Sequence, residues 1–191
     1  MSNTILYFHG FKSSSDSGKA QEFKKFIENK TSQTKIIIPD LKDDFKEAHK
    51  QIESLIEKNS PNILYMGSSL GGYYALYFAQ LYKTKSVLIN PAIPPLKDFE
   101  IHLGKNENYA TGNKFTISKD DISYVRSLHH KEILEPKNNL ILLESGDEIL
   151  NYAESSSYFR GSYIDIFYGG NHSYTSIKEK FTKIKDFFDL K

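Results

Sequence analysis

Six short apolar runs alternate with amphipathic segments along the 191 residues of this chain, and this alternation constrains the fold more than any other feature. The runs lie at Thr4–Phe8, Lys35–Ile38, the stretch that opens at Asn62, Ser86–Ile89, Leu140–Leu143 and Tyr163–Phe167. Strands that read as continuous apolar runs are typical of a parallel sheet covered by helices on both faces. The sequence therefore predicts the α/β class and a single domain over residues 1–191.

Helical spacing marks most of the segments between these runs. It occurs after Gly18, after Asp43, from Tyr74 to Leu81, from Tyr152 to Phe159 and from Ile177 to Phe188. Residues 92–139 break the rhythm, because they hold three of the six prolines and only one helical pattern, around residues 122–128. A segment this long in a compact domain is more often functional than incidental. We expect a small cap over the sheet edge, with an apolar underside made of Phe99, Tyr109, Phe115 and Tyr124.

Composition narrows the classes of function. The formal net charge is +1 and lysines are interspersed with Asp and Glu, so no basic field for nucleic acid is present. The chain has no cysteine, which excludes disulfides, thiolate metal sites and a cysteine nucleophile. The histidines lack metal-ligand spacing and no phosphate-binding loop is found, so we expect neither metal nor cofactor. No apolar run is long enough for a membrane span, and we expect a cytoplasmic protein without nucleic-acid or membrane partners.

The segment Gly67-Ser68-Ser69-Leu70-Gly71 joins the third apolar run directly to a helix. Almost no residues are left for a loop, so the chain must turn sharply at Ser69. Glycine has no Cβ, and the two glycines let the strand and helix backbones approach each other around this corner. The Ser69 hydroxyl is thereby exposed at the sheet edge, at the N-terminus of the helix. This arrangement predicts a nucleophilic serine.

Further polar groups follow other strand ends, and parallel strands bring such groups to one edge of the sheet. They are His9-Gly10-Phe11, Asp147 and His172. Acyl transfer needs a nucleophile, a base, an acid that orients the base, and donors for the oxyanion. We assign the first three roles to Ser69, His172 and Asp147, whose chain order is the one expected for this kind of turn. The backbone amides of Phe11 and Leu70 would bind the oxyanion.

Several neighbouring polar residues compete for these roles. We interpret Ser68, which precedes the corner, as a neighbour of the nucleophile whose side chain points elsewhere. Glu144 and Glu148 flank Asp147, and either could be merely solvated. His9 is expected to brace the Phe11 loop by hydrogen bonds rather than to transfer protons. The candidate substrate contacts are His9, Gly10, Ser68, Phe99 and Tyr109.

Six sequence blocks extend the pattern over nearly the whole chain: Tyr7–Ser14, Gly67–Ala75, Asn90–Ala92, Gly104–Gly112, Ser145–Tyr152 and Gly169–Tyr174. In these blocks the chain resembles the YqiA-like esterase family of small α/β-hydrolases. Their combination is far more specific than the Gly-x-Ser-x-Gly pattern alone. The resemblance implies a reduced α/β-hydrolase fold with sheet order 2-1-3-4-5-6. It also implies hydrolysis of carboxylic esters or thioesters by Ser69, Asp147 and His172.

The sequence thus predicts a serine hydrolase that cleaves carboxylic esters or thioesters of small to medium acyl groups through an acyl-Ser69 intermediate. Two alternatives stay open at this point. The same three residues could serve an acyl-CoA thioesterase or an amidase. The fold could also be kept as a non-catalytic binding module, although such a module would be expected to have lost part of the triad or of the turn around Ser69.

Overall fold

A six-stranded parallel sheet in the order β2-β1-β3-β4-β7-β8 forms the centre of the computed structural model, which describes residues 3–59 and 61–191. Its strands are β1 (Asn3–Phe8), β2 (Thr34–Ile37), β3 (Ile63–Ser68), β4 (Ser86–Ile89), β7 (Asn139–Glu144) and β8 (Tyr163–Phe167). All neighbours in this sheet pair in parallel. This confirms the α/β class and the sheet order that the family resemblance implied.

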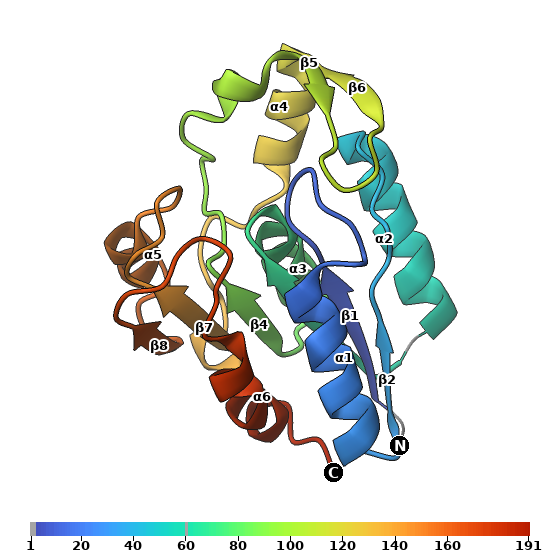
Figure 1. Cartoon of the computed structure of the whole chain (residues 1–191), viewed down its shortest axis with the longest axis vertical. Helices are drawn as coiled ribbons and strands as arrows, with labels where there is room; N and C mark the ends of the chain where they lie inside the picture. Colours follow the sequence, from blue (N-terminus) through green and yellow to red (C-terminus); the bar gives the residue numbers. More distant parts are fainter. Residues whose placement is uncertain (1–2, 60) are drawn as a thin grey trace.

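Helices cover both faces of the sheet (Figure 1). They are α1 (Gly18–Lys30), α2 (Phe45–Asn59), α3 (Leu70–Leu81), α4 (Lys119–Ser127), α5 (Tyr152–Tyr158) and α6 (Phe181–Phe187). α1 and α6 lie together on one face, where the rings of Phe23 and Phe181 meet at 5.3 Å between centroids. α2 and α3 pack on the other face. α3 is buried along most of its length, as expected of a helix that is apolar on nearly all sides.

The two-sided cover explains why the strands are continuously apolar. Successive side chains of a strand point to opposite faces. Tyr65 of β3 therefore packs with the α2 and α3 side, whereas Met66 packs with the α1 and α6 side. Ser68 follows Met66 by two residues and points to the same side as Met66. The side chain of Ser68 therefore points to the α1 and α6 face of the sheet and away from the turn at Ser69.

Residues 92–139 form a distinct structure above the carboxyl ends of the central strands (Figure 1). They contain a 3-10 turn (Phe99–His102), an antiparallel hairpin of β5 (Gly104–Glu107) and β6 (Lys114–Ile117), and then α4. The hairpin was not predicted, because its strands have four residues each and are largely exposed. α4 begins at a capping box in which Ser118 and Asp121 bind each other's backbone amides.

Two smaller features complete the fold. The segment expected to be one closing helix is divided into a 3-10 turn (Ile177–Lys180) and α6, and a further 3-10 turn (Pro136–Asn138) precedes β7. Over residues 3–59 and 61–191, none of the helices combines the length and hydropathy that a membrane span requires.

Candidate active site

Ser69 occupies a strained corner between β3 and α3. Its backbone angles are φ 55° and ψ −123°, and a positive φ is uncommon for a residue with a side chain. The corner is possible because a Cβ on Gly67 would lie 2.1 Å from the Gly71 carbonyl oxygen, and one on Gly71 would lie 2.1 Å from the Phe8 carbonyl oxygen. Glycine at both places allows α3 to touch β3 at Gly67 and the end of β1 at Phe8. The sequence analysis predicted the turn at this residue, Ser69.

Asp147 and His172 lie in the loops after β7 and β8 and are hydrogen bonded to each other. His172 Nδ1 lies 3.0 Å from Oδ1 and 2.9 Å from Oδ2 of Asp147. The Asp147 side chain is 2% exposed and its Oδ1 also accepts the amides of Ile149 and Leu150, each at 2.8 Å. A ring that donates from Nδ1 to a fixed carboxylate has its Nε2 free to accept a proton.

The end of β4 ties the loop of His172 to the corner at Ser69. The Ser69 amide donates to the Ile89 carbonyl at 3.0 Å. The side-chain amide of Asn90, the next residue, donates to the carbonyls of Asn171 and His172 at 3.1 and 3.3 Å. The corner at Ser69 and the loop of His172 are therefore hydrogen bonded to two consecutive residues, Ile89 and Asn90, at the end of β4. This brings the corner and the histidine loop to the same edge of the sheet.

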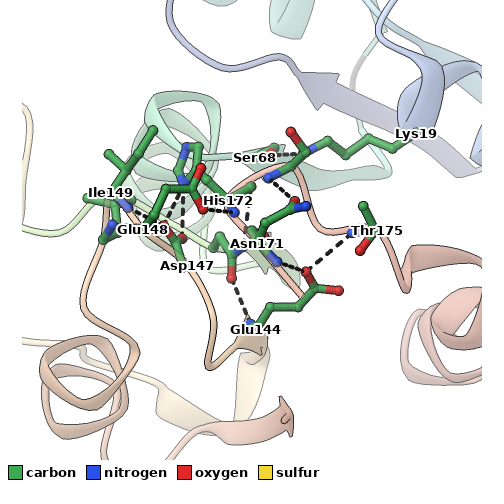
Figure 2. Close-up of polar contacts among 12 residues, drawn as sticks. Lys19, Ser68, Glu144, Asp147, Glu148, Ile149, Asn171, His172 and Thr175 are labelled. Atoms are coloured by element: carbon green, nitrogen blue, oxygen red, sulfur yellow. Dashed lines mark hydrogen bonds and ion pairs between the residues drawn. The ribbon is translucent and has the colours of Figure 1, made fainter. Parts of the chain in front are cut away.

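Glu144 supports the histidine loop from below (Figure 2). It is 0% exposed, so the expectation that it could be solvated is wrong. Its Oε2 accepts the amides of Asn171 at 2.7 Å and Thr175 at 3.3 Å, and its Oε1 accepts the amide of Ser176 at 2.9 Å. A buried carboxylate needs such donors, because an unpaired charge is costly away from water. Glu144 thus fixes the backbone that carries His172.

Glu148 differs from Glu144 in its exposure. Its carboxylate is at the surface and accepts the backbone amide of His172 at 2.9 Å. This hydrogen bond favours the charged carboxylate and lowers the pKa of Glu148. Glu148 therefore contacts the loop of His172 from its solvent side.

The loop after β1 approaches the corner from the opposite direction. A Cβ placed on Gly10 would lie 3.4 Å from the Ser69 Cβ. Within the described residues, the backbone amides of Phe11 and Leu70 donate to no protein acceptor. His9 braces the loop, since its Nδ1 donates to the Gly10 carbonyl at 2.9 Å and its Nε2 accepts the Leu41 amide at 3.0 Å. Burial lowers the pKa of His9, so this brace is a neutral imidazole.

Comparison with known proteins identifies the family. The sequence model of the family described as "Uncharacterised protein family (UPF0227)" matches residues 4–189. This chain belongs to the UPF0227 family. The expected resemblance to the YqiA-like family is thereby confirmed. A UPF0227 protein of Vibrio vulnificus (strain CMCP6) is 24% identical over 193 residues, which cover 96% of this chain and 97% of the relative.

Solved structures similar to this UPF0227 chain have the α/β-hydrolase fold. Alpha/beta hydrolase domain-containing protein 10 from mouse matches with a TM-score of 0.71 at 18% identity, over 97% of this chain and 89% of its own. Est1E from Butyrivibrio proteoclasticus, solved with bound ferulic acid, matches with a TM-score of 0.70 at 17% identity, over 97% and 87%. At such identities the likeness establishes the fold.

A shallow, open hollow lies beside the Phe11 loop of the UPF0227 chain. Phe11, Phe45, Leu70 and Tyr74 form its apolar side, and His9, Gly10 and the polar residues Lys12, Lys42, Asp43 and Asn108 also line it. The expected contacts Ser68, Phe99 and Tyr109 do not line this hollow. Phe99 packs against the Phe11 ring at 5.5 Å between centroids.

Tyr109 lies in the turn between β5 and β6 and is 83% exposed, so it departs from the expected apolar underside of residues 92–139. Its neighbour Asn108 points inward instead, where its side chain donates to the Ser13 carbonyl at 3.2 Å and to Asp43 Oδ1 at 2.8 Å. Phe115 and Tyr124 are packed against the core as expected. At the turn of the hairpin, the side chain that points inward is therefore Asn108 and not the ring of Tyr109.

Lys19 is a residue of this site that the sequence analysis missed. It lies in the first turn of α1, and its Nζ donates to the Ser68 Oγ at 2.8 Å (Figure 2). Nothing in the local sequence distinguishes it from the solvated lysines of the same helix. Across the described part of the chain, no group of three or more His, Asp or Glu side chains is arranged to hold a metal ion.

Proposed function

We propose that this UPF0227 chain is a serine hydrolase that cleaves carboxylic esters or thioesters of small to medium acyl groups. The observation that carries the proposal is the Asp147–His172 hydrogen bond, in a loop that shares the end of β4 with the strained corner at Ser69. A histidine oriented by a carboxylate, at the sheet edge that also carries a serine on a sharp turn, is the arrangement that activates a serine hydroxyl.

The reaction would proceed in two halves. Ser69 Oγ attacks the carbonyl carbon while Nε2 of His172 takes the hydroxyl proton, and Asp147 stabilises the imidazolium that forms. The tetrahedral intermediate then expels the alcohol or thiol, which receives the proton from His172, and an acyl-Ser69 ester remains. Water attacks this ester with His172 again as the base, and the acid leaves.

The amides of Phe11 and Leu70 would bind the oxyanion of both intermediates. Neither amide donates to an acceptor in the described part of the chain, which supports this role, since an oxyanion hole needs donors that are not already occupied. Leu70 is also the first residue of α3, so the positive end of the helix dipole faces the same place. One such donor is worth about 2.7–4 kcal/mol in related chemistry.

Apolar side chains beside these amides support a substrate with a modest acyl group. Phe11, Phe45, Leu70 and Tyr74 would contact hydrocarbon next to the carbonyl under attack. Est1E, which has the same fold, was solved with ferulic acid, an aromatic carboxylic acid. The likeness to Est1E is one of fold, and it supports acyl chemistry here only as an analogy.

Labelling with a fluorophosphonate tests the proposal. The Ser69 oxygen forms a bond to phosphorus, fluoride leaves, and the hydroxyl proton passes to His172. We expect a stoichiometric adduct located by peptide mass spectrometry at Ser69, and none in Ser69→Ala. Ser157→Ala, which removes an exposed hydroxyl of α5, is the matched control and should label as the wild type does.

An adduct at another residue, or equal labelling of Ser69→Ala, would refute the assignment of the nucleophile. Turnover of a matched ester, thioester and amide with one acyl group then separates the esterase from an acyl-CoA thioesterase or an amidase. A folded protein that neither labels nor turns over any of the three would instead be the non-catalytic binding module.

A further inference from the structure

Lys19 lies behind the corner at Ser69, where the mechanism above assigns it no task. It is half-buried, unlike Lys25 of the same helix, which is exposed. Its Nζ donates to the Oγ of Ser68, which is 4% exposed, at 2.8 Å. Because Ser68 is joined to Ser69 by one peptide bond, this contact places a fixed ammonium group beside the nucleophile turn.

The charges around the loop of His172 are mostly negative. Asp147 binds the imidazole, Glu144 binds the amide of Asn171, and Glu148 binds the amide of His172 from the solvent side. The Tyr174 phenol also faces Glu144, but burial raises its pKa so far that it stays neutral. Among these groups Lys19 supplies the positive charge, and Glu144 and Asp147 are the charges that act on it.

Carboxylates near an imidazole favour its protonation, because opposite charges stabilise the cation. Asp147 contacts the ring itself, whereas Glu144 and Glu148 contact the backbone amides beside it. A protonated imidazole cannot act as a base. A cation placed near the same carboxylates opposes their effect. We propose that Lys19 is a positioning residue for the His172 base: its ammonium, fixed by Ser68, offsets Glu144 and Asp147 and so keeps the imidazole unprotonated to lower pH.

The titration of Lys19 itself sets an upper limit to the pH range in which Lys19 can have this role. Burial lowers the pKa of Lys19 to about 8, although Glu144 and Asp147 both favour its charged form. The offset is therefore complete at acidic and neutral pH and is lost as the pH rises through about 8. On this proposal, the carboxylates act on the imidazole above that pH without the offset from Lys19.

The inference rests on the proposed function, because it takes His172 as the base for Ser69. Its test measures the second-order rate of fluorophosphonate labelling of Ser69 from pH 5 to 10. In Lys19→Met the acid limb of this rate should move to higher pH by about half a unit, so that on this limb the rate, taken relative to the variant's own plateau, is about threefold lower than in the wild type. Lys19→Arg keeps the charge, and Lys25→Met removes an exposed lysine from α1. The acid limb of each of these two variants should therefore coincide with the acid limb of the wild type.

A merely structural role for Lys19 would slow labelling at every pH and leave the acid limb in place, and that result would overturn the inference. If Lys19→Met does not fold by circular dichroism, the wild type decides. Its plateau should rise about twofold as the pH passes 8 and the base becomes stronger, whereas that of Lys19→Arg should stay flat. Equal plateaus would overturn the inference.

The wild type also separates the two proposals. If it gives no adduct at Ser69, the proposed function fails before any Lys19 variant is compared, and the role of Lys19 fails with it. If the wild type labels at Ser69 with a normal acid limb but that of Lys19→Met does not shift, only the role of Lys19 is refuted.

Discussion

Replacing Gly170 by alanine tests how firmly Glu144 holds the loop of His172. Gly170 has φ +71°, and a Cβ at this position would lie 2.0 Å from Oε2 and 2.2 Å from Cδ of Glu144. The carboxyl group must therefore move. Its movement would weaken the three amide hydrogen bonds that it accepts in the loop.

The cost of Gly170→Ala has two parts. Forcing a residue with a side chain into a sparsely populated backbone region costs about 1–3 kcal/mol. Each lost hydrogen bond to a charged group adds about 1.5–3 kcal/mol, and the loss of one or two of them adds about 2–4 kcal/mol after relaxation. The sum of about 3–7 kcal/mol is a large part of the stability of a small domain.

Gly169→Ala is the matched control, because Gly169 also has a positive φ, +101°, but a Cβ there meets nothing within 4 Å. It should cost only the backbone strain. The free energy of unfolding is measured by urea denaturation followed by far-UV circular dichroism. In the background of Glu144→Ala, which removes the atoms of the clash, Gly170→Ala should cost no more than Gly169→Ala. Equal costs of the two glycine substitutions in the wild-type background would refute the account of Glu144.

Two further predictions concern the histidines. Asp147→Asn retains an oxygen for the amides of Ile149 and Leu150 but no longer favours the Nδ1–H tautomer of His172. Fluorophosphonate labelling should therefore slow by about 10³–10⁴-fold, with little change in the urea midpoint. A loss below tenfold would contradict the role of Asp147. Burial lowers the pKa of His9 below its ordinary 6.5, so in acid the unfolded chain binds a proton at His9 more readily than the folded chain does. The contribution of the neutral His9 to the free energy of unfolding is therefore complete above about pH 6.5 and is lost as the pH falls below it. The free energy of unfolding of His9→Gln should therefore fall less between pH 7 and 5 than that of the wild type, and equal slopes would contradict this linkage.

The features that could be predicted from the sequence are those that local pattern determines. β4 occupies the run Ser86–Ile89 that its apolar residues predicted, because a strand covered on both faces must be apolar at every position. The corner at Ser69 is equally local, since a strand, two glycines and a helix within a few residues leave the chain little choice. Asp147 and His172 follow strand ends, and the parallel arrangement alone places them at the same edge.

The features that were missed depend on contacts between distant segments. Lys19 and Ser68 are 49 residues apart, and only the packing of α1 against the sheet brings them together. Glu144 looks like any acidic residue at the end of a strand. It is buried because the loop after β8 folds back over it through Gly170, a contact 26 residues away that no local periodicity records. The β5–β6 hairpin has strands of only four residues, and β5 has no apolar side chain, so the apolar pattern is too short to reveal it.

Glu144 at the end of β7 and Asp147 in the loop after it divide the support of one histidine between them. Asp147 binds the ring of His172 and thereby determines which nitrogen carries the proton, whereas Glu144 binds the backbone at Asn171 and determines where the ring lies. Because these contacts share no atom, the tautomer and the position of the imidazole can be perturbed separately. Asp147→Asn should therefore change the labelling rate without unfolding the loop, and Gly170→Ala should lower stability even where the Asp147–His172 bond is absent. In the Asp147→Asn background, a Gly170→Ala cost much smaller than in the wild type would mean that the two carboxylates act as one coupled unit.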